Sequence, residues 1–160
     1  MKRQRGMALL ISLVLSLLLG LLAASALREA IQQARLAGQL LASARALEQA
    51  EATLIDGAAL LTLTPPAPCQ ACMPPADPHD LAGGQGTWQN LASGYALLQN
   101  LGQSNRAAQM PEGEPVTLYR VTAVSQQTAA RHVLEAVYAL PSDPDQALQR
   151  VLWRQRLREP

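Results

Sequence analysis

Aromatic side chains are scarce in this chain, whose 160 residues include no Phe, two Trp and three Tyr. A hydrophobic core must therefore be built from Leu, Val and Ala, and a large aromatic ligand pocket is not expected. Basic charge is not in surplus either, because 13 Lys and Arg nearly balance 12 Asp and Glu and leave a net charge of +1. That balance argues against a protein that binds nucleic acid. The length allows one domain and no second full-sized core.

Charge is absent altogether from residues 7–27, a stretch of 21 residues that contains 12 Leu, Ile or Val. A hydrocarbon core about 30 Å thick needs about 20 such residues, and each one favours insertion by roughly 0.3–0.6 kcal/mol. The cations Lys2, Arg3 and Arg5 precede the stretch, and Arg28 follows it. Because positive charge stays on the cytoplasmic side, we expect a membrane span with its amino terminus in the cytoplasm.

A cleavable secretory signal is the alternative, with Ala24-Ser25-Ala26 as its small-residue cleavage site. However, the apolar stretch exceeds the usual length of about 7 to 15 residues, and a helical pattern continues beyond it. Apolar residues fall on one three-four stripe at Leu40, Ala44, Leu47, Leu54, Ala58 and Leu61. The pattern predicts one helix from about Met7 to about Leu61, with a stripe that must be buried. A plain signal anchor followed by a separate amphipathic helix is the simpler alternative.

The chain resembles a known family at both of its ends. The leader ending in Gly6, the stretch "MALLISLVLSLLLGLL" and the extension "ARALEQAEATL" look like a type IV prepilin, and in detail like a PilX-type minor pilin. The closing runs "YRVTA", "VLEAVYAL" and "LWRQRL" look like the final strands of that family. The resemblance implies that a prepilin peptidase cuts after Gly6 and that the new amino terminus, Met7, is N-methylated.

The resemblance also implies a division of the chain. It implies a leader at 1–6, a transmembrane and filament-core helix at 7–27 and a periplasmic head at 28–160. Within the head it implies an amphipathic half-helix at about 28–61, a proline-rich variable loop at 64–86 and a carboxyl-terminal sheet at 115–158.

One position departs from the pilin pattern. Major pilins and most minor pilins carry Glu at the fifth mature residue, where it is thought to pair with a neighbour's amino terminus, but this chain has Ile11. A carboxylate in an apolar core is costly unless it has a partner. K-type pseudopilins of type II secretion lack the same Glu and are believed to sit at the tip, so the analogy implies a tip or initiation subunit. The alternative is a subunit that still inserts along the shaft.

The segment "TLTPPAPCQACMPPADPHD" holds six prolines, which exclude a helix or a central strand and predict a loop. Its Cys69 and Cys72 are the only cysteines in the chain. On the far side of a membrane, where conditions are oxidising, the pair favours a local disulfide. A thioredoxin-like redox site is an alternative, although no βαβ pattern surrounds the pair. Zinc is another, with His79 and Asp80 completing a set of ligands.

The last fifty residues predict an antiparallel sheet of three or more strands, from "PVTLYRVTAVS", "RHVLEAVYAL" and "ALQRVLWRQRL". The alternation places three sets of side chains on common faces: Tyr119, Val121 and Ala123; Leu134, Ala136, Tyr138 and Leu140; and Val151, Trp153, Gln155 and Leu157. Upstream, Trp88, Leu91, Tyr95 and Leu98 have three-four-three spacing, which predicts a short amphipathic helix or an irregular segment. The fold class is therefore α+β, with a long amino-terminal helix covered by a carboxyl-terminal sheet, as in the pilin fold.

Catalytic motifs are not apparent in the sequence. His79 and His132 have no visible nucleophile partner, and no phosphate-cradling glycine loop or Ser-His-Asp order occurs. Asp143 and Asp145 are candidate calcium ligands, but their spacing matches no EF-hand loop and Asp-Pro pairs commonly form turns. We expect neither an enzyme nor a cofactor.

Three classes of function fit these features. The first is a minor pilin, whose implied partners are other minor pilins and the major pilin through the helix, the prepilin peptidase, the inner-membrane assembly platform and a tip adhesin. It would lie first in the inner membrane and then in the pilus. The second is a K-like pseudopilin of type II secretion, although that class usually has a larger head. The third is a membrane-anchored periplasmic protein that uses Cys69 and Cys72 as thiols or metal ligands.

Overall fold

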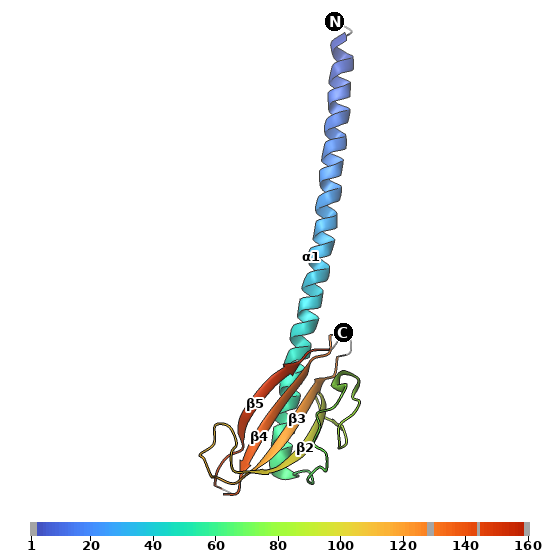
Figure 1. The fold of residues 1–160 in the computed structure, drawn as a ribbon. Helices are drawn as coiled ribbons and strands as arrows, with labels where there is room; N and C mark the ends of the chain where they lie inside the picture. Colours follow the sequence, from blue (N-terminus) through green and yellow to red (C-terminus); the bar gives the residue numbers. More distant parts are fainter. Residues whose placement is uncertain (1–2, 128–129, 144, 159–160) are drawn as a thin grey trace. The chain divides into compact units, whose positions relative to one another are not determined.

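The computed structural model describes residues 3–127, 130–143 and 145–158, with side chains in the first helix described from residue 7 onward. Its elements in chain order are α1 (Arg3–Leu63), η1 (Pro78–Asp80), β1 (Gln89–Asn90), β2 (Gly94–Ser104), β3 (Val116–Ser125), β4 (Val133–Pro141) and β5 (Gln149–Arg156), as drawn in Figure 1. The chain divides into two units, Met1–Leu41 and Ala42–Pro160. The α+β class predicted from the sequence is confirmed.

A single helix, α1, forms the amino-terminal part of the chain, so the prediction of one helix from about residue 7 to about residue 61 is confirmed. Its apolar stretch contains hydroxyl groups that bond back to the helix itself. Ser12 Oγ donates to the Leu9 carbonyl at 2.9 Å, and Ser16 Oγ donates to the Ser12 carbonyl at 2.8 Å. These polar groups are therefore satisfied without water, as a lipid environment requires. The helix ends at Leu63 because Pro65 and Pro66 follow.

The sheet has five antiparallel strands in the order β1-β2-β3-β4-β5, which is the order of the sequence. Figure 1 shows β2 to β5 side by side, with the last turns of α1 against them. In the β3–β4 register, Tyr119 lies opposite Tyr138, Val121 opposite Ala136 and Ala123 opposite Leu134. These six residues form one core cluster with Ala50, Leu54, Leu61 and Leu98. The predicted inward faces of the first two sequence-predicted strands are thus confirmed.

The segment before these strands differs from the prediction. The sequence predicted a short helix or an irregular segment around Leu91, Tyr95 and Leu98, but β2 covers Gly94–Ser104 and pairs with β3 along its length. The sheet therefore begins at β1 and not near residue 115. The strand was missed because both of its faces are buried: Leu98 faces the core with α1, and Leu97 packs against Gly84 of the proline-rich loop. A strand buried on both faces loses the apolar-polar alternation.

The buried stripe of α1 overlaps the predicted one and is wider: Leu54 and Leu61 are buried, and Leu47 and Ala58 pack against the core cluster, as predicted. Leu40 is 71% exposed and Ala44 is also exposed, whereas the buried positions are Ala46, Ala50, Thr53, Leu54, Gly57 and Leu61. Several of these buried positions carry small residues because the sheet lies too close to the helix for larger side chains. A Cβ on Gly57 would lie 2.8 Å from Val121 Cγ1. The predicted stripe did not include Ala46, Ala50, Thr53 and Gly57, because small or polar side chains add little to a hydrophobic pattern.

The last strand follows its predicted face only in part. Trp153 pairs with Ala136 and Gln155 pairs with Leu134, which places both on the core face as predicted. A register shift follows, because Val137 pairs with Leu152 while Tyr138 pairs with Arg150. The bulge leaves Val151 without a partner in β4. Arg150 lies on the sheet face that was predicted for Val151. Leu157 lies beyond β5 and is 77% exposed, so its placement on that face was wrong.

Candidate functional site

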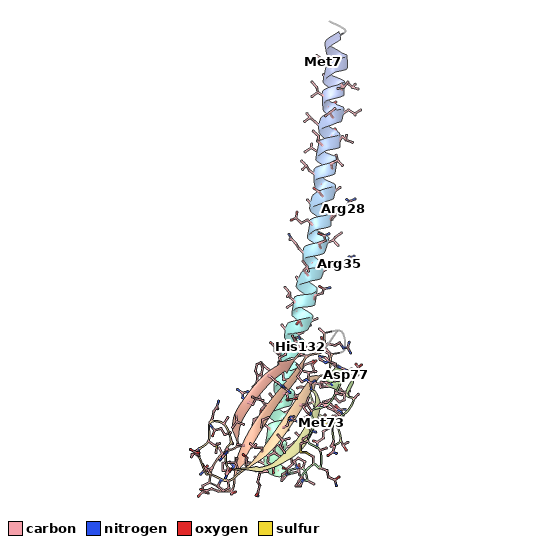
Figure 2. All side chains as sticks on the ribbon, viewed as in Figure 1. Met7, Arg28, Arg35, Met73, Asp77 and His132 are labelled. Atoms are coloured by element: carbon pink, nitrogen blue, oxygen red, sulfur yellow. A yellow bond between two sulfur atoms is a disulfide. The ribbon has the colours of Figure 1, made fainter. Side chains whose placement is uncertain are left out.

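The apolar part of α1 is the first candidate functional region. One 18-residue window of the helix has a mean hydropathy of 2.7, and none of that window is buried in the structure. Met7 is 70% exposed and Ile11 is 55% exposed, and Figure 2 shows Met7, Arg28 and Arg35 along the helix. The helix is therefore long and apolar enough to span a membrane. Gly6 lies within the same helix, and cleavage after it remains a prediction.

The proline-rich loop carries the predicted disulfide between Cys69 and Cys72, which is confirmed. The loop is tied to β2 by hydrogen bonds as well. The Cys69 N–H donates to the Asn100 carbonyl at 3.2 Å, and Asn100 Nδ2 donates to the Pro66 carbonyl at 3.1 Å. Because the two sulfurs are bonded to each other, they do not form the alternative zinc site. In the described part of the chain, no three His, Cys, Asp or Glu residues gather as metal ligands.

An ion cluster on the sheet face opposite α1 was not predicted. Glu135 is buried, with a side chain 2% exposed, and its carboxylate lies 2.6 Å from Arg154 Nη2, 3.7 Å from Arg120 Nε and 3.9 Å from Arg156 Nη1. Burial lowers the pKa of Arg120, although the Glu135 charge opposes that shift. The cluster balances one buried carboxylate with several guanidinium groups.

The same arginines connect the sheet to the proline-rich loop. Arg120 Nη1 donates to the Cys72 carbonyl at 2.9 Å, and Arg156 Nη1 donates to the Pro75 carbonyl at 2.9 Å. The loop therefore covers the outer face of the sheet and is held by charge-assisted hydrogen bonds. The sequence signal was a single carboxylate inside the apolar run "VLEAVYAL", followed by arginines at alternating positions near the end of the chain.

The two histidines do not pair with each other. His132 Nε2 lies 2.9 Å from Ser43 Oγ, and His132 Nδ1 lies 2.8 Å from Gln155 Nε2. Both ring nitrogens therefore have a polar partner, one from α1 and one from β5, and these partners hold the imidazole in place.

The acidic pair near the end of β4 has a turn-forming role. Asp143 Oδ1 accepts a hydrogen bond from the Asp145 N–H at 3.1 Å, and the Asp143 carbonyl accepts one from the Gln146 N–H at 3.2 Å. This is the Asx-turn geometry that Asp favours at chain reversals. The Asp143 side chain therefore stabilises the turn predicted for "SDPDQ", and Asp145 contributes its backbone N–H.

His79 gives the loop a predicted dependence on pH. Burial and the positive charge of Arg158 lower the pKa of His79 from 6.5. The unfolded chain therefore binds a proton to this histidine more readily than the folded chain does. The free energy of unfolding is highest above about pH 6.5, and it decreases as the pH falls from there through the lowered pKa of His79. We expect His79→Gln to reduce the fall in urea midpoint between about pH 7.5 and 5.5. An equal fall in both proteins would contradict this assignment.

Searches against protein-family models, curated proteins and solved structures find no match to this chain. The functional interpretation therefore depends on the residues themselves.

Proposed function

We propose that this chain is a minor pilin that takes part in type IV pilus assembly and is inserted through its amino-terminal helix. The observation that carries the proposal is the combination on α1: a basic leader ending in Gly6, an uncharged stretch that starts at Met7, and a final part that packs against an antiparallel sheet. Each part of this combination has a distinct task in an assembled filament.

The leader and the apolar stretch account for membrane entry and processing. The cations keep the leader in the cytoplasm, and Gly6 offers the peptidase a backbone without a side chain. After cleavage, the uncharged helix anchors the subunit in the inner membrane and then joins the shared core of the filament. The head faces the periplasm, where the Cys69–Cys72 disulfide is stable.

Ile11 supports a position at the tip or in an initiation complex. A subunit with no neighbour above it has no amino terminus to neutralise there, so an apolar residue avoids leaving a carboxylate unpaired in the filament core. The partners proposed are other minor pilins and the major pilin along α1, the prepilin peptidase and the assembly platform, with a tip adhesin on the head. A K-like pseudopilin is the second candidate, and the same missing Glu favours it.

Intact-mass analysis of the chain from membranes and from sheared pili tests the proposal. We expect the wild-type chain to begin at N-methylated Met7, and a Gly6→Leu variant to retain residues 1–6 because a side chain blocks the peptidase. Gly20→Ala, a helix glycine with nothing within 4 Å of its added Cβ, is the matched control and should be processed normally. A wild-type chain that begins at Leu27, or that keeps residues 1–6, would overturn the proposal.

A deletion strain separates the two candidates. Loss of pili with normal secretion of exoproteins is expected for a minor pilin. Loss of secretion with normal pili would select the pseudopilin. Recovery of the chain from sheared pili in amounts similar to the major pilin would contradict a place at the tip.

A further inference from the structure

A cavity of about 590 Å³ lies at the end of the sheet where His132 is labelled in Figure 2. Its walls come from α1, η1, the residues before β4, and the end of β5 with the residues that follow it. The residues that set its charge are His79, Asp80, Arg131, His132, Arg156 and Arg158. Segments far apart in sequence thus bring three guanidinium groups to one cavity, with a single carboxylate among the described lining residues.

The carboxylate in this cavity neutralises little of the positive charge. Asp80 Oδ1 lies 2.8 Å from Arg158 Nη2, but the two side chains are 62% and 65% exposed. Water and salt screen such a pair, so it holds the arginine weakly. An incoming anion can therefore compete with Asp80 for Arg158.

Arg131 provides a second positive charge to the cavity. Its guanidinium donates to the His79 backbone carbonyl, which fixes its position without neutralising it. Among the residues that the structure describes, no carboxylate lies within 4.0 Å of this guanidinium, and its Nε has no hydrogen-bond partner. A positioned arginine without a counter-charge is an energetically suitable site for an anion.

We propose that this cavity binds a phosphate-bearing anion, held by Arg131 and Arg158. A guanidinium matches two oxygens of one anion, and a phosphate group has enough oxygens to engage two guanidinium groups at once. The two oxygens of a carboxylate lie in one plane, whereas phosphate oxygens are arranged tetrahedrally and can meet guanidinium groups that approach from different directions. The proposal goes beyond the minor-pilin function and does not depend on it. The phosphate can come from a free phosphate or from a phospholipid headgroup.

Amide NMR titrations of the full chain in zwitterionic micelles test the site. The probes are inorganic phosphate and sn-glycero-3-phosphoglycerol, a water-soluble anionic headgroup, each compared with acetate. We expect saturable shifts of the Arg131 and His132 amides with a phosphate probe and weaker binding of acetate. Arg131→Gln and Arg158→Gln should each weaken that binding by about tenfold, the effect of one charge-assisted hydrogen bond.

Two further comparisons separate loss of anion binding from loss of folding or of surface charge. Arg158 is exposed, so Arg158→Gln should leave the fold intact even if Arg131→Gln loosens the loop. Arg106→Gln, at an exposed site after β2, is the matched control and should change binding by less than about twofold. Binding of inorganic phosphate supports a free-phosphate ligand, and binding of the headgroup alone supports a lipid. Absence of saturable shifts, or equal binding by all three variants, would overturn the proposal.

Discussion

Replacing Glu135 with Ala is expected to lower the free energy of unfolding by about 3–5 kcal/mol, the usual cost of removing one partner of a buried ion pair. The carboxylate is the only acidic group that faces Arg120, Arg154 and Arg156 among the ion pairs of the described residues. Without it, Arg120, whose side chain is 14% exposed, would remain charged beneath the loop with no counter-ion. Urea unfolding of the full chain in micelles, followed by circular dichroism, measures the loss.

Two further variants separate the charge from general effects of mutation. Glu135→Gln keeps the size of the side chain and an oxygen that can accept from Arg154 Nε, which lies 2.9 Å from Glu135 Oε1. It should therefore lose less stability than Glu135→Ala. Glu112→Ala, at an exposed position, should stay within about 0.5 kcal/mol of the wild type. A Glu135→Ala variant as stable as Glu112→Ala would show that the cluster contributes nothing to the fold.

Gly94→Ala is expected to lower the free energy of unfolding by about 3 kcal/mol, at the upper end of the range for overpacked sites. Gly94 begins β2 and is buried between β3 and α1. An added Cβ would overlap the Val124 carbonyl oxygen and would lie 2.7 Å from Thr53 Oγ1. The carbonyl belongs to the sheet backbone, so a side-chain rotation cannot relieve the overlap. Thr53 Oγ1 is itself fixed by a 2.7 Å hydrogen bond to the Gln49 carbonyl.

Gly38→Ala is the matched control for Gly94→Ala. Its added Cβ meets nothing within 4 Å, and Gly38 has a helical backbone. Alanine in a helix interior is favoured over glycine by about 0.5–1 kcal/mol, so this variant should be as stable as the wild type or slightly more stable. Urea midpoints of the two variants make the comparison. Similar midpoints would contradict the close contact of β2 with α1 and β3.

The long helix, two of the strands and the disulfide could be predicted from the sequence because each depends on a short stretch of residues. The charge-free residues 7–27 and the absence of proline before Pro65 were sufficient to predict α1. Alternation was sufficient for β3 and β4, since the face predicted by Tyr119, Val121 and Ala123 is the buried one. Two cysteines separated by two residues in a proline-rich segment were sufficient for the disulfide.

Features that join distant segments could not be read in the same way. The three-residue spacing of Tyr95 and Leu98 favours a helix, and only the pairing with β3 shows that the segment is a strand with these side chains on opposite faces. The stripe of α1 that becomes buried depends on how closely the sheet approaches, which selected Ala46, Ala50 and Gly57. The bulge in β5, which places Arg150 instead of Val151 on the predicted face, depends on the register between β4 and β5.

By itself, the sequence determined that this chain has a membrane-compatible helix, a constrained loop and a strand-forming carboxyl-terminal part, because hydrophobic periodicity and proline act over a few residues. Only the tertiary structure decided that Glu135 is buried among arginines and that Arg131 and Arg158 line one cavity with His79. The reason is physical. Charges 15 to 78 residues apart in sequence, from Arg120 with Glu135 to Asp80 with Arg158, meet only after the sheet has formed and the loop has folded over it.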